Sequence, residues 1–173
     1  MPFWSQRRNT SAVTDGSTAR ALAPALEPIR LYLPDRQVEG WIISTDERVT
    51  DLLNRREVLR VCVDPADDVW ESADLEDLLL VAPPLQAGDP QRRVHRRKHR
   101  LVGLVGPYVV TGVAHIALGQ DPEAYLLRTR QHFLPMTDAH VTSRVDGSID
   151  EVLPVVILNV GNLTELRAQL TLA

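Results

Sequence analysis

Apolar and polar residues alternate along two long stretches of this chain, and a glycine interrupts each stretch. The glycines are Gly40, in Val-Glu-Gly, and Gly112, in Val-Thr-Gly. In both halves an apolar run, a helix-start signal and a pair of leucines follow, Leu52-Leu53 in the first half and Leu126-Leu127 in the second. Alternation with a period of two is typical of a strand with one buried face. Its recurrence in the same order indicates an internal duplication.

The pattern predicts a mainly β (α+β) fold made of two copies, each a small, strongly bent antiparallel sheet or barrel with one short inserted helix. A glycine in mid-strand predicts a sharp bend or a close approach of another backbone. Ser44 to Glu47 offer caps for the first helix, and Asp121-Pro122-Glu123 form a stronger start for the second. The predicted strands cover residues 29–33, 38–43, 58–63, 78–82, 133–136, 139–145 and 152–160.

Changes in composition divide the chain into four parts. Residues 1–28 are expected to form a mobile tail and a short helix, and residues 29–83 the first β unit. Residues 84–100 are expected to be a linker, rich in Pro and Gly and then basic, before the second β unit at 101–173. A unit of about 55 residues buries too little surface to be stable alone. The two units are therefore expected to pack against each other.

The composition is that of a globular protein. The chain has 173 residues, of which 44% are hydrophobic and 24% charged, which excludes fibrous and wholly disordered proteins. Its one cysteine, Cys62, cannot form an internal disulfide, and its alternating surroundings predict that it is buried in a protein of a reducing compartment. No apolar stretch approaches the roughly 18 residues that span a bilayer. These features favour a cytoplasmic location without membrane association.

Charge is distributed unevenly along the chain. The net charge is −4, yet six of the 19 basic residues fall in the predicted linker. These six are Arg92, Arg93, Arg96, Arg97, Lys98 and Arg100. Such a segment suits the phosphates of a nucleic acid. Alternatively it docks on the chain's own acidic stretch from Asp64 to Asp77, which is expected to be a solvated loop. The sequence leaves both interpretations open.

No arrangement of residues indicates catalysis. His115, His132 and His140 lie near Asp138 in the second copy, but no pair has the spacing of a zinc motif. The alternation also points His115 away from the core. No Ser-His-Asp order, glycine-rich phosphate loop or catalytic pair of carboxylates stands out. We therefore expect no catalytic residue, no metal, no cofactor and no enzymatic activity.

The second copy resembles the Sm-like small barrels, and the first copy resembles them over a shorter stretch. The resemblance rests on the bent strand at Gly112, the turn at Asp146-Gly147 and the apolar run that ends in Gly161-Asn162. It implies a five-stranded, highly bent antiparallel sheet, ring formation in some members and binding of uridine-rich RNA. The family's RNA-contacting residues do not carry over, since Val160 stands where the family has Arg. The doubled pattern also resembles bacterial families with no assigned activity.

These observations favour a non-enzymatic binding or assembly module. It is expected to contact a partner protein, or further copies of itself, through the duplicated β scaffold, the basic linker and outward residues such as Trp41. The alternative is a nucleic-acid-binding protein on an Sm-like scaffold, because the basic linker suits a polyanion.

Overall fold

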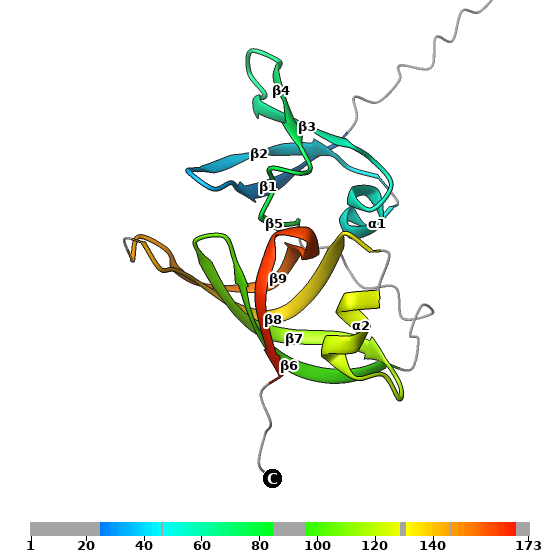
Figure 1. Cartoon of the computed structure of the whole chain (residues 1–173). Coiled ribbons are helices and arrows are strands. Elements are labelled where there is room, and N and C mark those ends of the chain that lie inside the picture. The colour runs from blue at the N-terminus through cyan, green and yellow to red at the C-terminus, as the bar shows by residue number, and fades with distance from the viewer. Residues whose placement is uncertain (1–24, 46, 85–95, 129–130, 146, 169–173) are drawn as a thin grey trace, which may run out of the picture.

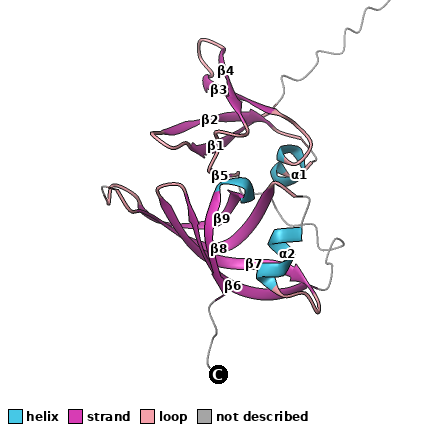
Figure 2. Cartoon of the chain, in the orientation of Figure 1, coloured by secondary structure: helices cyan, strands magenta, loops and turns pink. Residues whose placement is uncertain are grey.

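The computed structural model describes residues 25–45, 47–84, 96–128, 131–145 and 147–168. Their strands form one antiparallel sheet that curls into a partial barrel (Figure 1). Short helices lie beside the sheet (Figure 2). The prediction of a mainly β chain with a short helix in each half is confirmed. The expectation of two sheets is wrong, because the strands of both halves belong to one.

Each half contributes a hairpin, a helix, a second hairpin and a final strand. The first half contains β1 (Leu26–Tyr32), β2 (Gln37–Ile43), α1 (Val49–Leu53), β3 (Val58–Asp64), β4 (Val69–Asp74) and β5 (Leu80–Ala82). The second half contains β6 (Arg96–Val105), β7 (Tyr108–Ala117), α2 (Pro122–Arg128), β8 (Phe133–Ser143), β9 (Asp150–Asn159), the 3-10 turn η2 (Val160–Asn162) and β10 (Leu163–Ala168).

The order of strands in the sheet is β10-β6-β7-β8-β9-β5-β1-β2-β3-β4. In each half the final strand lies beside the first, and the other strands follow in chain order. Pairing of β5 with β9 joins the two halves. This common order agrees with a repeated unit, but it does not by itself establish a duplication. The superposition of the two halves stays a prediction.

Four segments differ from the sequence prediction. The strand β1 begins at Leu26, so residues 26–28 of the predicted tail belong to the sheet. The strand β6 begins at Arg96, so Arg96–Arg100 belong to a strand and not to a linker. The acidic stretch, expected to be a loop, contains β4. A further strand, β10, lies beyond the last predicted one. The predicted tail helix and the linker residues Arg92 and Arg93 lie outside the described residues.

The strand β5 supplies side chains to two hydrophobic cores. Leu80 belongs to a cluster with Leu158 and the apolar side chains of the second half. Val81 belongs to a cluster with Ile157 and the apolar side chains of the first half. Successive residues of a strand point to opposite faces of the sheet. The joint between the halves is therefore buried on both faces, which confirms the prediction that the two units pack against each other.

Gly40 and Gly112 lie where the neighbouring strand passes closely. A methyl group at Gly40 would clash with Val61 and stand 2.7 Å from the carbonyl oxygen of Cys62. At Gly112 it would stand 3.1 Å from the carbonyl oxygen of Thr137. The pairing of β7 with β8 shifts register at this glycine. The predicted close approach of two backbones is confirmed at both positions.

Replacing Gly40 with Ala should lower the free energy of unfolding by about 1–3 kcal/mol, since the added methyl group forces β2 and β3 apart. Urea denaturation measures this change. Ser72→Ala, on the exposed part of β4, serves as a control and should alter stability by no more than about 0.5 kcal/mol. An unchanged denaturation midpoint for Gly40→Ala would contradict the close approach of the two strands.

A charged cluster links β1 to β9 beside the joint. The Tyr32 hydroxyl donates a hydrogen bond to Glu151 at 2.6 Å, and Arg30 forms ion pairs with Glu151 at 2.6 Å and with Glu39 at 2.8 Å. Burial, followed by the hydrogen bond to Glu151, raises the pKa of Tyr32. The Tyr32 ring also packs edge-on against Tyr108, with 5.6 Å between the ring centroids. The cluster therefore ties the two halves by both polar and aromatic contacts.

Removing the hydroxyl with Tyr32→Phe should destabilise the chain by about 1.5–3 kcal/mol, because the hydrogen bond ends on a charged carboxylate. Tyr125→Phe, whose hydroxyl makes an exposed hydrogen bond to Gln131 at 3.3 Å, is the matched control and should have little effect. Both effects are measured by urea denaturation at neutral pH.

The same residue predicts a loss of stability in alkali. Unfolded tyrosine releases its proton near pH 10, whereas the raised pKa keeps Tyr32 protonated in the folded chain, so its contribution is complete below about pH 10 and falls as the pH rises above it. The difference in stability between the natural chain and Tyr32→Phe should therefore shrink from about pH 8 to about pH 10.5. A difference that stays constant or grows would contradict this assignment.

Candidate binding surfaces

The three histidines of the second half do not form a metal site. His115 lies 3.2 Å from the Thr137 hydroxyl, and His140 lies 2.5 Å from Asp150. His132 is exposed ahead of β8. Within the described residues, no group of three or more His, Cys, Asp or Glu side chains could hold a metal ion. Surface contacts account for the positions of His115 and His140.

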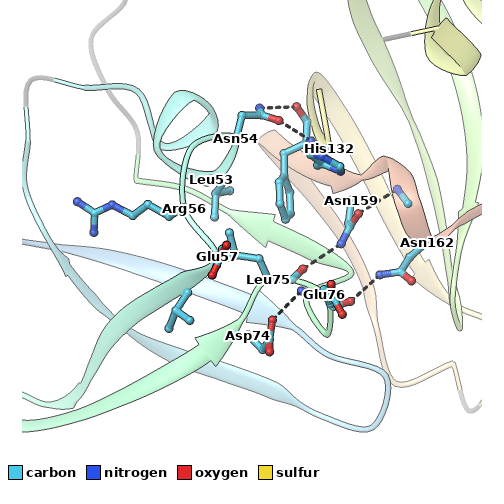
Figure 3. A pocket seen from close by; sticks show the side chains of 13 residues that line it. Leu53, Asn54, Arg56, Glu57, Asp74, Leu75, Glu76, His132, Asn159 and Asn162 are labelled. Atoms are coloured by element: carbon cyan, nitrogen blue, oxygen red, sulfur yellow. Dashed lines mark hydrogen bonds between the residues drawn. The ribbon is translucent and has the colours of Figure 1, made fainter. Parts of the chain in front are cut away.

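A hollow of about 640 Å³ lies where α1, β3 and β4 meet β8 and η2 (Figure 3). Three asparagines, Asn54, Asn159 and Asn162, form part of its wall. Asn54 donates to the Phe133 carbonyl oxygen at 3.0 Å and accepts from the Phe133 amide at 3.0 Å. Asn159 donates to the carbonyl oxygens of Leu75 and Leu78 at 3.0 and 2.8 Å.

The side-chain amides of all three asparagines are engaged with the protein backbone. The Asn159 side-chain oxygen also accepts from the Gly161 amide at 3.0 Å, and Asn162 donates to the Glu76 carbonyl oxygen at 3.0 Å. The charged residues at the rim, among them Arg56 and Glu57, are exposed. The asparagines therefore close the joint between the halves, and the remaining polar side chains of the hollow are the exposed ones at its rim.

A row of side chains crosses the outer face of the first half. The pairing of strands β1 to β4 places Pro28, Trp41, Cys62 and Trp70 directly opposite one another. Their neighbours in sequence, such as Ile29, belong to the core of the first half. Since side chains alternate between faces, the row points away from that core. Trp41 lies on the outer face, as the alternation predicts.

Cys62 is only 1% exposed although it lies in this outward row. The residues opposite it on both sides are Trp41 and Trp70, whose large side chains are half-buried. The prediction of a buried cysteine is confirmed, but its cover is on the outer face of the sheet. We call this surface the tryptophan face. It comprises Leu26, Pro28, Trp41, Ile43, Arg60, Cys62 and Trp70.

Two contacts orient the ring of Trp70. Its indole nitrogen donates to Asp68 at 2.7 Å, and the Arg60 guanidinium lies 5.3 Å from the ring centroid. Leu26 and Ile43 remain 36% and 44% exposed on the same face. The sequence prediction missed Trp70 because the surrounding acidic residues suggested a loop. Residues 69–74 mix apolar and polar side chains on both faces, so their sequence carries no alternation that could have indicated a strand.

The described basic residues of the predicted linker lie on both faces of β6. Arg96, Lys98 and Arg100 share one face, and Arg97 points to the other. All four are exposed. The pKa of His115, opposite Lys98 on β7, is lowered by burial and then by the positive charges of Lys98 and Arg96. The sheet thus carries a basic stripe made of Arg96, Lys98 and Arg100.

The acidic stretch lies far from this basic stripe. The hairpin of β3 and β4 is at one end of the molecule, and the start of β6 is near the other end (Figure 1). Docking of Arg96–Arg100 on residues 64–77 of the same chain is therefore wrong. Residues 25–84 carry 14 acidic and six basic residues, and residues 96–168 carry seven acidic and eight basic residues. The two halves differ strongly in net charge.

No family model, curated protein or solved structure matches the chain. Its resemblance to Sm-like barrels therefore stays an expectation from the sequence. Within the described residues, no helix is long and apolar enough to cross a membrane.

Replacing Lys98 with Met should raise the pKa of His115, because a nearby positive charge that opposes protonation is removed. The value should remain below that of an exposed histidine, since burial is the larger cause of the shift. An NMR titration of the imidazole signals measures the pKa. Arg128→Met on α2 is the control. A pKa equal to that of the natural chain would show that Lys98 does not face His115.

Proposed function

We propose that the chain is a protein-binding module and that the tryptophan face is its docking site. The main support is the position of Trp41 and Trp70 in one row across strands β1 to β4. Exposed Leu26 and Ile43 lie on the same face. Tryptophan and arginine are enriched among residues that dominate binding energy. Contiguous apolar surface with a polar border is a common mark of protein contact sites.

The charge of the first half supports a partner with a basic border around its apolar side chains. The first half has eight more acidic than basic residues, and Asp64, Asp68 and Asp74 lie on or beside the strands of the face. Electrostatic complementarity speeds association and disfavours partners of the same sign. The face therefore suits a protein segment that presents apolar side chains bordered by Lys and Arg.

Binding of nucleic acid is the second candidate, and the basic stripe on β6 favours it. Single strands are usually held by cations together with aromatic rings that stack on the bases. In this chain the cations Arg96, Lys98 and Arg100 lie on the second half, whereas Trp41 and Trp70 lie on the first. Any binding of a polyanion would thus depend mainly on charge, and its affinity would fall steeply with salt.

The proposal is tested with two labelled peptides that share the same apolar residues, one with interspersed Lys and one with interspersed Glu. The natural chain should bind the basic peptide more tightly. Trp41→Ala and Trp70→Ala should each weaken that binding by roughly 30-fold, because buried aromatic anchors carry most of the affinity. Fluorescence anisotropy measures the binding.

The control is Val152→Ala on the second half, where Val152 is 77% exposed, and it should bind as the natural chain does. Ile43→Asp changes an exposed residue of the tryptophan face and should also weaken binding. It replaces a tryptophan variant that fails to fold. Equal affinity for the two peptides, or binding that survives all face variants, sinks the proposal. Binding of a single-stranded oligonucleotide, lost in an Arg96, Lys98 and Arg100 triple Ser variant, would favour the second candidate instead.

A further inference from the structure

The described sheet has two open edges, β4 at one end and β10 at the other. The pairing between the two halves of the chain shows that strands at such edges can pair with each other. There β5 pairs with β9 through Leu80 opposite Leu158 and Val81 opposite Ile157. Because the strand order is the same in both halves, β10 is the counterpart of β5, and β4 is the counterpart of β9. The open edge strands β10 and β4 thus correspond to β5 and β9, which pair with each other inside the chain.

The side chains near β10 form an unfilled counterpart of that joint. Ile29 lies opposite Gly40 and Leu101 lies opposite Gly112, so Tyr32 and Leu104 occupy corresponding positions, three residues further on. Tyr32 lies opposite Leu80 and is fully buried in a cluster composed mainly of second-half side chains.

Leu104 instead remains partly exposed beside Glu165. It lines a hollow of about 260 Å³ on the outer face of β6 and β10. The apolar floor of this hollow includes Val102 and Val109, and Arg144 and Arg167 are among its polar residues. Tyr32 of the first half is thus covered by other side chains, whereas its counterpart Leu104 in the second half borders a hollow.

The first half is left uncovered in a complementary way. Its residues Leu33, Val38 and Ala73 are only partly buried at the margin of their core. By the same count from the glycines and their cross-strand partners, their counterparts in the second half are Val105, Val110 and Leu158. These counterparts are at most 1% exposed and share a cluster with Tyr32, Leu79 and Leu80 of the first half. The positions that the first half covers in the second half are therefore only partly buried in the first half itself.

Charge favours contact between unlike edges. β4 carries Glu71 and Asp74 in the strongly acidic half. β10 carries Glu165 and Arg167, and Arg144 lies beside it. Charged side chains on an edge strand normally oppose pairing with an identical edge. Two β4 edges would repel each other, whereas β4 and the more basic end of the molecule attract.

We infer that a second copy of this chain docks head to tail, with β4 of one copy alongside β10 of the next. The contact extends the sheet and covers Leu33, Val38 and Ala73 of one copy with the outer face around Leu104 of the other. Because the two surfaces are different, each copy keeps one free edge, and association continues into a ring or an open chain. The tryptophan face is not needed for this contact.

A charge-swap experiment tests the inference on the full chain. In one variant Glu71 and Asp74 are changed to Arg, and in a second variant Arg144 and Arg167 are changed to Glu. Sedimentation velocity of the natural chain should show mass increasing with concentration above the 19.3 kDa of one copy. Each variant alone should sediment as a monomer. Their mixture should associate again, because unlike edges then carry opposite charges.

Circular dichroism and thermal melting of each variant show whether it is folded, and recovery in the mixture can only come from folded chains. Trp41→Ala should associate as the natural chain does, which separates this inference from the proposed docking on the tryptophan face. A natural chain that stays monomeric at high micromolar concentration overturns the inference. So does association that persists in both variants, or a mixture of folded variants that remains monomeric.

Discussion

The pairing of β5 with β9 is the interaction on which the rest of the structure depends. β5 has three residues, yet Leu80 and Val81 enter different cores. Loss of this strand would uncover Tyr32 on one face and Phe133 on the other, since each is buried in a cluster composed mainly of the other half. Burial of apolar surface is the dominant favourable term in folding. Each half therefore depends on the other for its stability.

Several backbone groups at the joint are satisfied by side chains where strands end. Asn54 bonds both backbone groups of Phe133, as a neighbouring strand would, and Asn159 bonds two carbonyl oxygens in the segment between β4 and β5. A buried backbone group without a partner costs about as much as a lost hydrogen bond. These amides allow the chain to turn at the joint without that cost, and the hollow described above lies where they do so.

Features that depend on neighbours in sequence could be predicted, and pairings between distant segments could not. Asp121 caps α2 by accepting from the Ala124 amide at 2.9 Å, as its position before Pro122 indicates. The mid-strand glycines likewise predict close backbones. Nothing in the alternation of residues 78–82 says that β5 meets β9. The charged start of β6 lacks the apolar alternation of a strand, and its ladder to β7, which begins at Arg96 opposite Ala117, is visible only in three dimensions.

The two halves use the same strand order to present opposite surfaces. The outer face of the first half carries tryptophans among acidic residues, and β6 carries arginine and lysine at alternating positions. Since the net charge of the first half repels polyanions, a ligand suited to the basic stripe is excluded from the tryptophan face. Joining the halves edge to edge, instead of face to face, leaves both outer surfaces free. The proposed docking on the tryptophan face and the proposed head-to-tail contact of copies both require these surfaces to be free.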